Sequence, residues 1–418
     1  MKKLFIYSFL LLSFYSKAQV SVIFNSEVAD TVHTFAGVWG NGSFDATALN
    51  SKFVSKFYTG SFIDKDTKDG VLNRTHNINR VGEEVNYGLF VAFRPDSLAH
   101  RKNMSYFIGL SDRQHFDARY SDDFYKVAFY GNASYAGRTA YLTDFNLNFI
   151  RYQQLQLGFL KKNTANTLQW GMGFSFLKGE QYASITAHKA ELFTSQDGQY
   201  INFDTDMQIA QTDTAHRGLG AFNGYGASLD VFLMAPLKTK MGTSIIRVAV
   251  SDVGMIRFNK QSLYLNQDSL FHFTGFKINN IHDLQDSTFR TTNKDSIASK
   301  VAPFGKKAFN VTIPATLVVS FETQYTKRFQ LTEVVKFIYN ANYSLLFYVK
   351  GKYQLGARTS ISATVGYGGY GKINGGIGLN ARLGKAWLVH VGSDHIEGFI
   401  APQSAAGLGV NCSVIKCF

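Results

Sequence analysis

From Val85 to the C-terminus, apolar and polar side chains alternate with a period of two. Val85, Tyr87 and Leu89, for example, alternate with small or polar residues. The same alternation recurs in segments 104–111, 144–149, 168–176, 225–233, 316–322, 343–352, 360–367, 377–383 and 387–392. Because successive side chains of a strand point to opposite faces, these segments are predicted to be β-strands with one apolar and one polar face.

The last segment, Ser404–Phe418, shows the pattern up to the final residue. One side carries Leu408, Val410, Cys412, Val414, Lys416 and Phe418, and the other carries mostly Gly, Ser and Asn. A terminal amphipathic strand ending in Phe is typical of outer-membrane barrels, so we expect Phe418 to act as an assembly signal. An ordinary strand of a soluble sandwich would also alternate.

Two features favour a lipid-facing barrel over a soluble sandwich. The apolar faces are large and aromatic at the strand ends, and the opposite faces carry Gly, Ser, Asn and Gln, as a hydrated interior would. Connections such as 371–374 and 384–385 are short, whereas others are long. We therefore predict an all-β fold, a transmembrane antiparallel β-barrel of about 14 strands over residues 85–418.

Three parts of the chain depart from this pattern. Residues 19–84 alternate only in short pieces, so we expect an N-terminal lead-in or plug-like segment with at most a first strand. Residues 180–222 and 254–312 contain strands whose faces are too polar for lipid, and we expect both to be extra-membrane β insertions. A short helix is expected around 293–299.

The N-terminus predicts export. Residues 1–18 combine Lys2 and Lys3 with an apolar stretch and end in a small residue, Ala18, which predicts a cleaved signal peptide. The apolar stretch is shorter than the ~20 residues that a spanning helix needs. We expect the mature protein in the cell outer membrane.

Composition supports this expectation. Aromatic residues make up 15% of the chain and only 5 residues are Pro, which suits long paired strands and interfacial aromatic girdles. The formal net charge is +13. For an exported barrel, we expect the partners to be outer-membrane lipid and lipopolysaccharide, the barrel insertion machinery, and secretion-system or surface proteins, with no nucleic acid.

No motif predicts a cofactor, a metal or catalysis. Cys412 and Cys417 are five residues apart in one strand, so they face opposite sides and form no disulfide. His188, Asp204 and Asp206 lie in a polar hairpin where solvated side chains are expected. Asp122 and Asp123 are expected to cap a short helix running to Phe129.

The neighbours Ser393, Asp394 and His395 cannot form a triad, which needs residues converging from separate places. Gly366–Gly371 precedes no helix that would make it a phosphate loop. We predict that the protein is not an enzyme.

The polar faces of the C-terminal strands supply the candidate site residues. Glu322, Lys350, Asn380, Arg382 and His390 fall on faces opposite to the apolar ones, so we expect them to line the lumen. There they either tune the choice of solute or pair with one another to fill a closed interior.

One further region carries a family resemblance. The stretch 123–159, with Phe129, Tyr130, Gly131 and Asn132 followed by alternating strands, resembles a family of uncharacterised bacterial outer-membrane proteins known only as a domain of unknown function. The motifs GYGASLD, SDVGMIRF, IPATL and SDHIEGF, beginning at residues 224, 251, 313 and 393, extend the resemblance.

That family is similar in architecture to FadL-like fatty-acid transporters and to PorV barrels of type IX secretion. The resemblance implies transport of a hydrophobic or small solute, or alternatively a non-conducting scaffold or shuttle subunit of a secretion or surface-assembly machine. An outer-membrane enzyme is a distant third. The family has no established catalytic residues.

Overall fold

The structure is a computed structural model of the 418-residue chain. It describes residue 28 and residues 32–95, 103–163, 168–213, 215, 218–239, 242–274 and 304–418. The predicted signal peptide and the helix expected around 293–299 lie outside the described residues. Among the described helices, none has the length and apolar character needed to cross a membrane.

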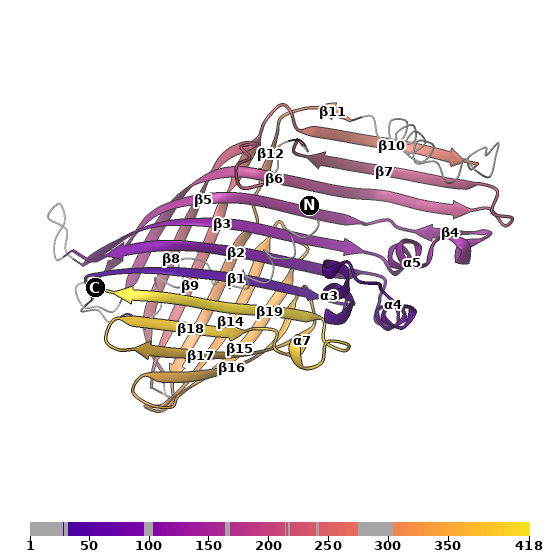
Figure 1. Ribbon diagram of the computed structural model, residues 1–418. Helices are drawn as coiled ribbons and strands as arrows, with labels where there is room; N and C mark the ends of the chain where they lie inside the picture. Colours follow the sequence, from indigo (N-terminus) through magenta and orange to yellow (C-terminus); the bar gives the residue numbers. More distant parts are fainter. Residues whose placement is uncertain are drawn as a thin grey trace.

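The chain forms a closed antiparallel barrel of 14 strands, as the alternation predicts. The strands of the ring, in order, are β1 (Thr34–Ala46), β2 (Asn79–Phe93), β3 (Met104–Tyr120), β5 (Asn146–Lys162), β6 (Gln169–Thr194), β8 (Gly224–Thr239), β9 (Gly242–Phe258), β13 (Ala315–Gln324), β14 (Phe329–Tyr339), β15 (Ser344–Gln354), β16 (Thr359–Gly369), β17 (Ile373–Leu383), β18 (Trp387–Ser393) and β19 (Gly407–Cys417). The last strand pairs with the first, from Phe35 opposite Cys417 to Asp45 opposite Gly407. This pairing closes the ring (Figure 1).

The expected boundary of the barrel at Val85 is wrong. β1 and the first six residues of β2 belong to the barrel wall, so the barrel begins at Thr34. Residues between these strands form two helices, α3 (Ser51–Thr59) and α4 (Lys65–Leu72), rather than a plug. Of the predicted lead-in, Val28 is buried among side chains of the barrel interior.

The two ends of the barrel differ. At one end, which we call the short-turn rim, turns 325–328, 355–358 and 384–386 join consecutive strands, and the C-terminal Phe418 lies beside Thr34. The opposite end, the insertion rim, carries segments 47–78, 121–145, 180–223, 259–314 and 394–406. Of the two short connections named from the sequence, 384–385 lies at the short-turn rim as expected, whereas 371–374 lies at the insertion rim, where β16 turns into β17.

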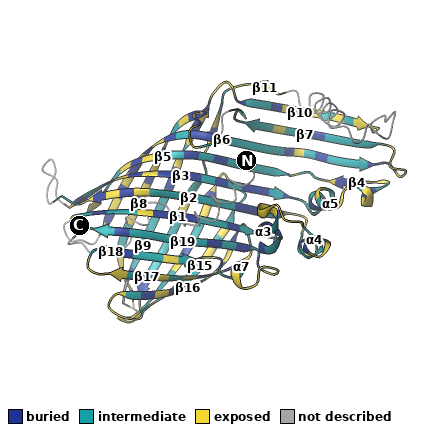
Figure 2. Cartoon of the chain, in the orientation of Figure 1, coloured by how far each residue is buried: buried dark blue, intermediate teal, exposed yellow. Residues whose placement is uncertain are grey.

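The insertion rim is dominated by strands that continue beyond the ring. β6 pairs with β8 only as far as Gly179, and its far half pairs with β7 (Ile201–Gln211). β10 (Leu263–Phe273) pairs with β7, and β4 (Arg138–Tyr141) pairs with the end of β6. The short strands β11 (Gly305–Lys306) and β12 (Phe309–Thr312) pair with β10 and β9. The resulting sheet projects from the barrel (Figures 1 and 2).

Helices cover the outer face of the barrel at the insertion rim. α3, α4 and α5 (Asp122–Tyr130) contribute Phe53, Val71 and Tyr125 to a buried cluster with Phe44 and Ala118 of the wall. α5 is the helix expected from Asp122 to Phe129. Its cap is Ser121, however, whose hydroxyl accepts from the Phe124 amide, while the two aspartates lie in the first turn.

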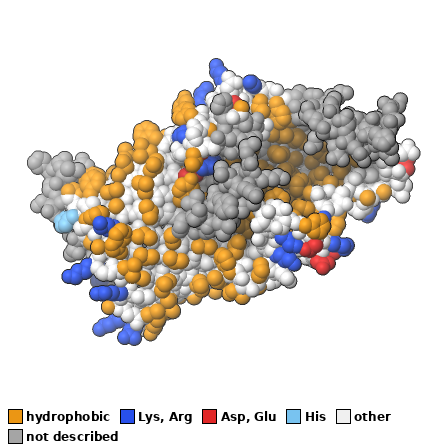
Figure 3. Space-filling view, viewed as in Figure 1, with side chains coloured by type: hydrophobic (Ala, Val, Ile, Leu, Met, Phe, Trp, Pro, Cys, Tyr) orange, Lys and Arg blue, Asp and Glu red, His pale blue; other side chains and the backbone are white. Residues whose placement is uncertain are grey.

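The facing of the C-terminal strands follows the alternation. Val365 and Leu379 lie on the outer surface with exposed fractions of 68% and 46%, whereas Thr364 and Asn380 line the interior. Apolar side chains cover the outer face of the barrel in Figure 3. The outer face is therefore the surface that meets lipid.

Arginine substitutions test this facing. Val365→Arg and Leu379→Arg are expected to lower the free energy of unfolding in phospholipid vesicles by about 2–4 kcal/mol, since a charge is placed in the apolar band. Thr364→Arg and Asn380→Arg, on the same strands but facing the interior, are expected to cost far less. Denaturant unfolding of the refolded barrel measures the difference, and equal costs at both pairs would contradict the assignment.

The terminal residue allows a second test. Phe418 is exposed at the short-turn rim, and the Lys416 ammonium lies over its ring and over that of Trp387. Deleting Phe418 is expected to lower the yield of heat-modifiable barrel severalfold, because an interfacial anchor and the expected assembly signal are lost. Lys416→Gln serves as the control, since a long side chain at the rim reaches the interface by snorkelling and its charge is dispensable.

Candidate functional site

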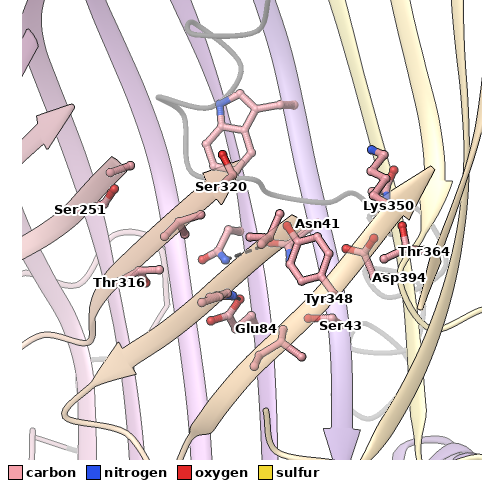
Figure 4. Close-up of a pocket in the computed structure, with 18 of the residues that line it drawn as sticks. Asn41, Ser43, Glu84, Ser251, Thr316, Ser320, Tyr348, Lys350, Thr364 and Asp394 are labelled. Atoms are coloured by element: carbon pink, nitrogen blue, oxygen red, sulfur yellow. Dashed lines mark hydrogen bonds and ion pairs between the residues drawn. The ribbon is translucent and has the colours of Figure 1, made fainter. Parts of the chain in front are cut away.

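The lumen contains a cavity of about 440 Å³. Its walls come from strands all round the ring, including Asn41 of β1, Glu84 of β2, Ser251 of β9, Thr316 of β13 and Tyr348 of β15. Figure 4 shows these side chains converging on the same interior space. No single strand builds the site, because each contributes only the residues on its inward face.

An apolar layer fills part of the lumen toward the short-turn rim. It consists of inward side chains from seven strands together with Val28: Phe35, Trp39, Phe90, Ala92, Phe107, Leu160, Phe232, Leu388 and Ile415. Phe35 and Phe90 meet edge to face with their ring centroids 6.0 Å apart. Packing of this kind removes apolar surface from water and fills the part of the lumen next to these strands.

The β13–β15 side of the lumen is polar instead. Arg247 of β9 makes a two-pronged ion pair with Glu322 of β13, at 2.8 and 3.2 Å. Gln330, Thr332, Lys350 and Lys352 continue the cavity lining toward the short-turn rim; we call this side the polar wall. The cavity therefore extends along one side of the lumen past the apolar layer.

A network of charged and aromatic side chains crosses the lumen toward the insertion rim. Glu84 of β2 lies 3.5 Å from His115 Nδ1 and 3.9 Å from Lys336 Nζ of β14. β2 and β14 are half the ring apart, so this contact spans the barrel. His115 Nε2 lies 3.1 Å from both an Asp117 carboxylate oxygen and the Tyr370 hydroxyl.

A glycine makes the network possible. Tyr370 packs so closely on Gly82 that a Cβ there would overlap its ring. Without a side chain at position 82, the Tyr370 ring lies against the wall of β2 and its hydroxyl reaches His115. The opposite side of the network is held by Asn342, whose backbone amide donates to Asp117 at 2.9 Å.

A second cluster of charged side chains lies next to the apolar layer. The Asp230 carboxylate accepts from the backbone amide of Asp252 at 2.6 Å and from the Gln156 amide, and Asp252 accepts from Gln154 at 2.9 Å. The positive charge opposing both carboxylates is Arg113, whose guanidinium stacks on Trp39 at 5.3 Å. Arg113 thus joins the polar and apolar parts of the lumen.

The segment after β18 reaches the end of the cavity that is nearest the insertion rim. His395 is buried and its Nδ1 lies 3.0 Å from Glu397. Burial lowers the pKa of His395, but the carboxylates of Asp45 and Glu397 outweigh it and hold the pKa above its usual value. Ser393 only accepts a hydrogen bond from the His395 amide, so these neighbours do not converge as a triad would.

Four of the five side chains expected in the lumen line the cavity, and one lies elsewhere. Glu322 and Lys350 belong to the polar wall, and on the neighbouring wall the Asn380 side-chain oxygen accepts from His390 Nδ1 at 2.7 Å. Arg382 is exposed close to turn 384–386 and does not line the cavity. Arg113 and the Asp230–Asp252 pair were not among the expected site residues.

The candidates of the polar hairpin fall outside the lumen. His188 sits in a β-bulge of the projecting sheet, and Asp204 pairs with Lys189 at 2.5 Å. Within the described ranges, no three His, Cys, Asp or Glu side chains are close enough together to hold a metal ion. Cys412 and Cys417 are free thiols.

The closed ring, the apolar outer face and the polar lumen define a β-barrel of the kind that fits an outer membrane. The chain belongs to the family of unknown function DUF5723, whose model matches residues 34–394. The resemblance to an uncharacterised barrel family is thereby confirmed. The match starts at the first residue of β1. No curated protein matches the sequence.

Solved structures with a similar chain path include the toluene transporter TodX of Pseudomonas putida, with a TM-score of 0.44 and 10% identity over 97% of this chain and 93% of that chain. The toluene transporter TbuX of Ralstonia pickettii gives 0.43 and 9% over 97% and 94%. A FadL homologue of Pseudomonas aeruginosa gives 0.44 and 10% over 92% and 90%.

Removing the Arg113 charge tests the electrostatics of the lumen. Arg113→Met leaves Asp230 and Asp252 without a buried counter-charge and is expected to lower the free energy of unfolding by about 3 kcal/mol. Adding Asp252→Asn to that variant is expected to recover part of the loss. Arg328→Met, in an exposed turn, is the control and is expected to change stability by at most about 0.5 kcal/mol in the same denaturant titration.

Proposed function

We propose that the protein is an outer-membrane transport barrel that passes a small amphipathic solute along the polar wall of its lumen. The observation that carries the proposal is the two-sided cavity. One side is apolar, with Trp39, Phe232 and Leu388, and the other is polar, with Thr332 and Lys350. A solute with one apolar and one polar face would satisfy both sides at once.

The cavity has buried polar atoms beside the apolar layer that are suited to such a solute. Trp39 Nε1, Arg113 Nε and Asn411 Oδ1 are buried and find no hydrogen-bond partner among the described residues. An unmet buried donor or acceptor costs free energy, which a polar group of a passing solute or a water would recover. Because the acidic and basic side chains lining the cavity roughly offset each other, a strongly charged solute is not favoured.

Transport is tested by obstructing the polar wall. Thr332→Trp places a large ring in the cavity and is expected to reduce solute flux or conductance in planar bilayers severalfold, since the open side of the lumen narrows. Val335→Trp is the matched control, because it lies on the same strand but faces outward. It adds the same bulk without entering the lumen.

The second candidate is a non-conducting scaffold or shuttle subunit of a secretion or surface-assembly machine. Two observations favour it: the apolar layer with Val28 fills part of the lumen, and the β6, β7 and β10 sheet offers a large surface beyond the ring. Absence of conductance and solute uptake by the unaltered, heat-modifiable barrel would contradict transport and favour the scaffold.

A further inference from the structure

The short-turn rim carries an excess of positive charge. Segment 94–103 between β2 and β3 contains one acid, Asp96, against two Arg and one Lys, and segments 161–168, 237–243, 325–328, 355–358 and 384–386 contain no Asp or Glu. They do contain exposed cations, which we call the basic rim: Lys161, Lys238, Lys327, Arg328, Arg358 and Lys385. Figure 3 shows Lys and Arg side chains gathered at this end of the barrel.

The basic rim is not neutralised by the rest of the described chain. None of its six members forms an ion pair with a described acid. The acids on adjacent strands are engaged or distant: Glu322 faces inward and pairs with Arg247, and Glu333 lies on the outer face of β14, beyond the turn. At the insertion rim, in contrast, Lys65 pairs with Asp69 at 2.5 Å and Lys126 with Asp122 at 2.7 Å.

The basic rim lies at the level of a membrane interface. Outward aromatic side chains stand next to its turns, with exposed fractions of 45% for Tyr325, 43% for Tyr353 and 44% for Trp387. Aromatic belts mark the height of lipid headgroups. Lys385 lies in the turn 384–386, two residues before Trp387, the first residue of β18. The cations therefore reach the phosphate layer rather than bulk solvent.

We propose that the basic rim binds the phosphate headgroups of anionic phospholipids in the leaflet on that side of the membrane. Lys161 and Lys238 lie near the ends of β5 and β8, and the other four cations lie in the turns that follow β13, β15 and β17, so they are distributed round most of the ring. A headgroup layer surrounds the barrel in this way, whereas a docked acidic protein or nucleic acid would need a compact patch. The inference is independent of solute transport.

The test uses the full refolded barrel in nanodiscs of phosphatidylcholine alone or mixed with phosphatidylglycerol. Native mass spectrometry of the released barrel is expected to show retained phosphatidylglycerol in severalfold excess over phosphatidylcholine, falling as salt rises. In the triple variant Arg328→Gln, Arg358→Gln and Lys385→Gln, retention is expected to fall, by about fivefold per cation removed.

The matched control removes three exposed cations from the insertion rim: Lys65→Gln, Lys260→Gln and Lys306→Gln. It changes the net charge equally and is expected to leave retention unchanged. Heat modifiability on gels confirms that each variant is folded, and the single variant Arg358→Gln replaces the triple variant if that fails to fold. Equal retention of both lipids by the unaltered barrel, or equal losses in the two triple variants, would overturn the proposal.

Lipopolysaccharide is the competing source of phosphate. Added at equal phosphate concentration, it is expected to leave the phosphatidylglycerol on the unaltered barrel. Displacement of phosphatidylglycerol from the basic rim by lipopolysaccharide would overturn the assignment to a phospholipid leaflet. An acidic protein that displaces the phospholipid at low salt would likewise replace this proposal with a protein interface.

Discussion

Every part of this structure depends on the pairing of β1 with β19. In hydrocarbon no water is present to satisfy backbone N–H and C=O groups, so a sheet crosses lipid only when its two edges pair with each other. Here the pairing runs from Phe35 with Cys417 to Asp45 with Gly407, and the Phe418 amide still donates to Thr34. The strand that the sequence identifies least well is thus the one that closes the ring.

Closure creates a second requirement, which is that the interior must be filled or hydrated. The lumen meets it in two ways. Toward the short-turn rim it packs Trp39 and Phe232 into an apolar layer, and toward the insertion rim it places Glu84, His115 and Lys336 across the barrel. Buried charges are tolerated because each has a partner from another strand. The cavity is the space that these two arrangements leave beside the polar wall.

The sequence predicts the fold well wherever one strand face is lipid and the other is polar. It predicts β16 and β17 because Val365 and Leu379 contrast with Thr364 and Asn380. It fails for β1 because the inward face there belongs to the apolar layer. Phe35 therefore points inward while small residues occupy much of the outer face, and the contrast disappears. Alternation reports the difference between two environments, not the strand itself.

The candidate site is predicted less completely for a related reason. Glu322 and Lys350 are recognisable because they fall on the polar face of clearly alternating segments. Arg113 and Asp230 are not, since their importance lies in contacts between strands distant in the sequence: Arg113 stacks on Trp39, and Asp230 accepts from the Asp252 amide. Arg382 is on the expected face of its strand, but it lies too close to the short-turn rim to line the cavity. A period of two predicts which face of the sheet a residue is on, and not how far it lies from the end of the strand.

The height of the membrane can instead be inferred from where charge begins on the outer face. On the insertion side, outward Phe176 of β6 is followed by Lys178 and Glu180, and Arg151 lies 3.1 Å from Glu180 and 3.2 Å from Asp112. These charges are paired within the protein. On the short-turn side, the turns 325–328, 355–358 and 384–386 carry cations and contain no Asp or Glu. Among the described residues, the two boundaries of the apolar band therefore differ: Arg151 pairs with Glu180 and Asp112 on the insertion side, whereas the cations of the basic rim draw their counter-charge from outside the chain.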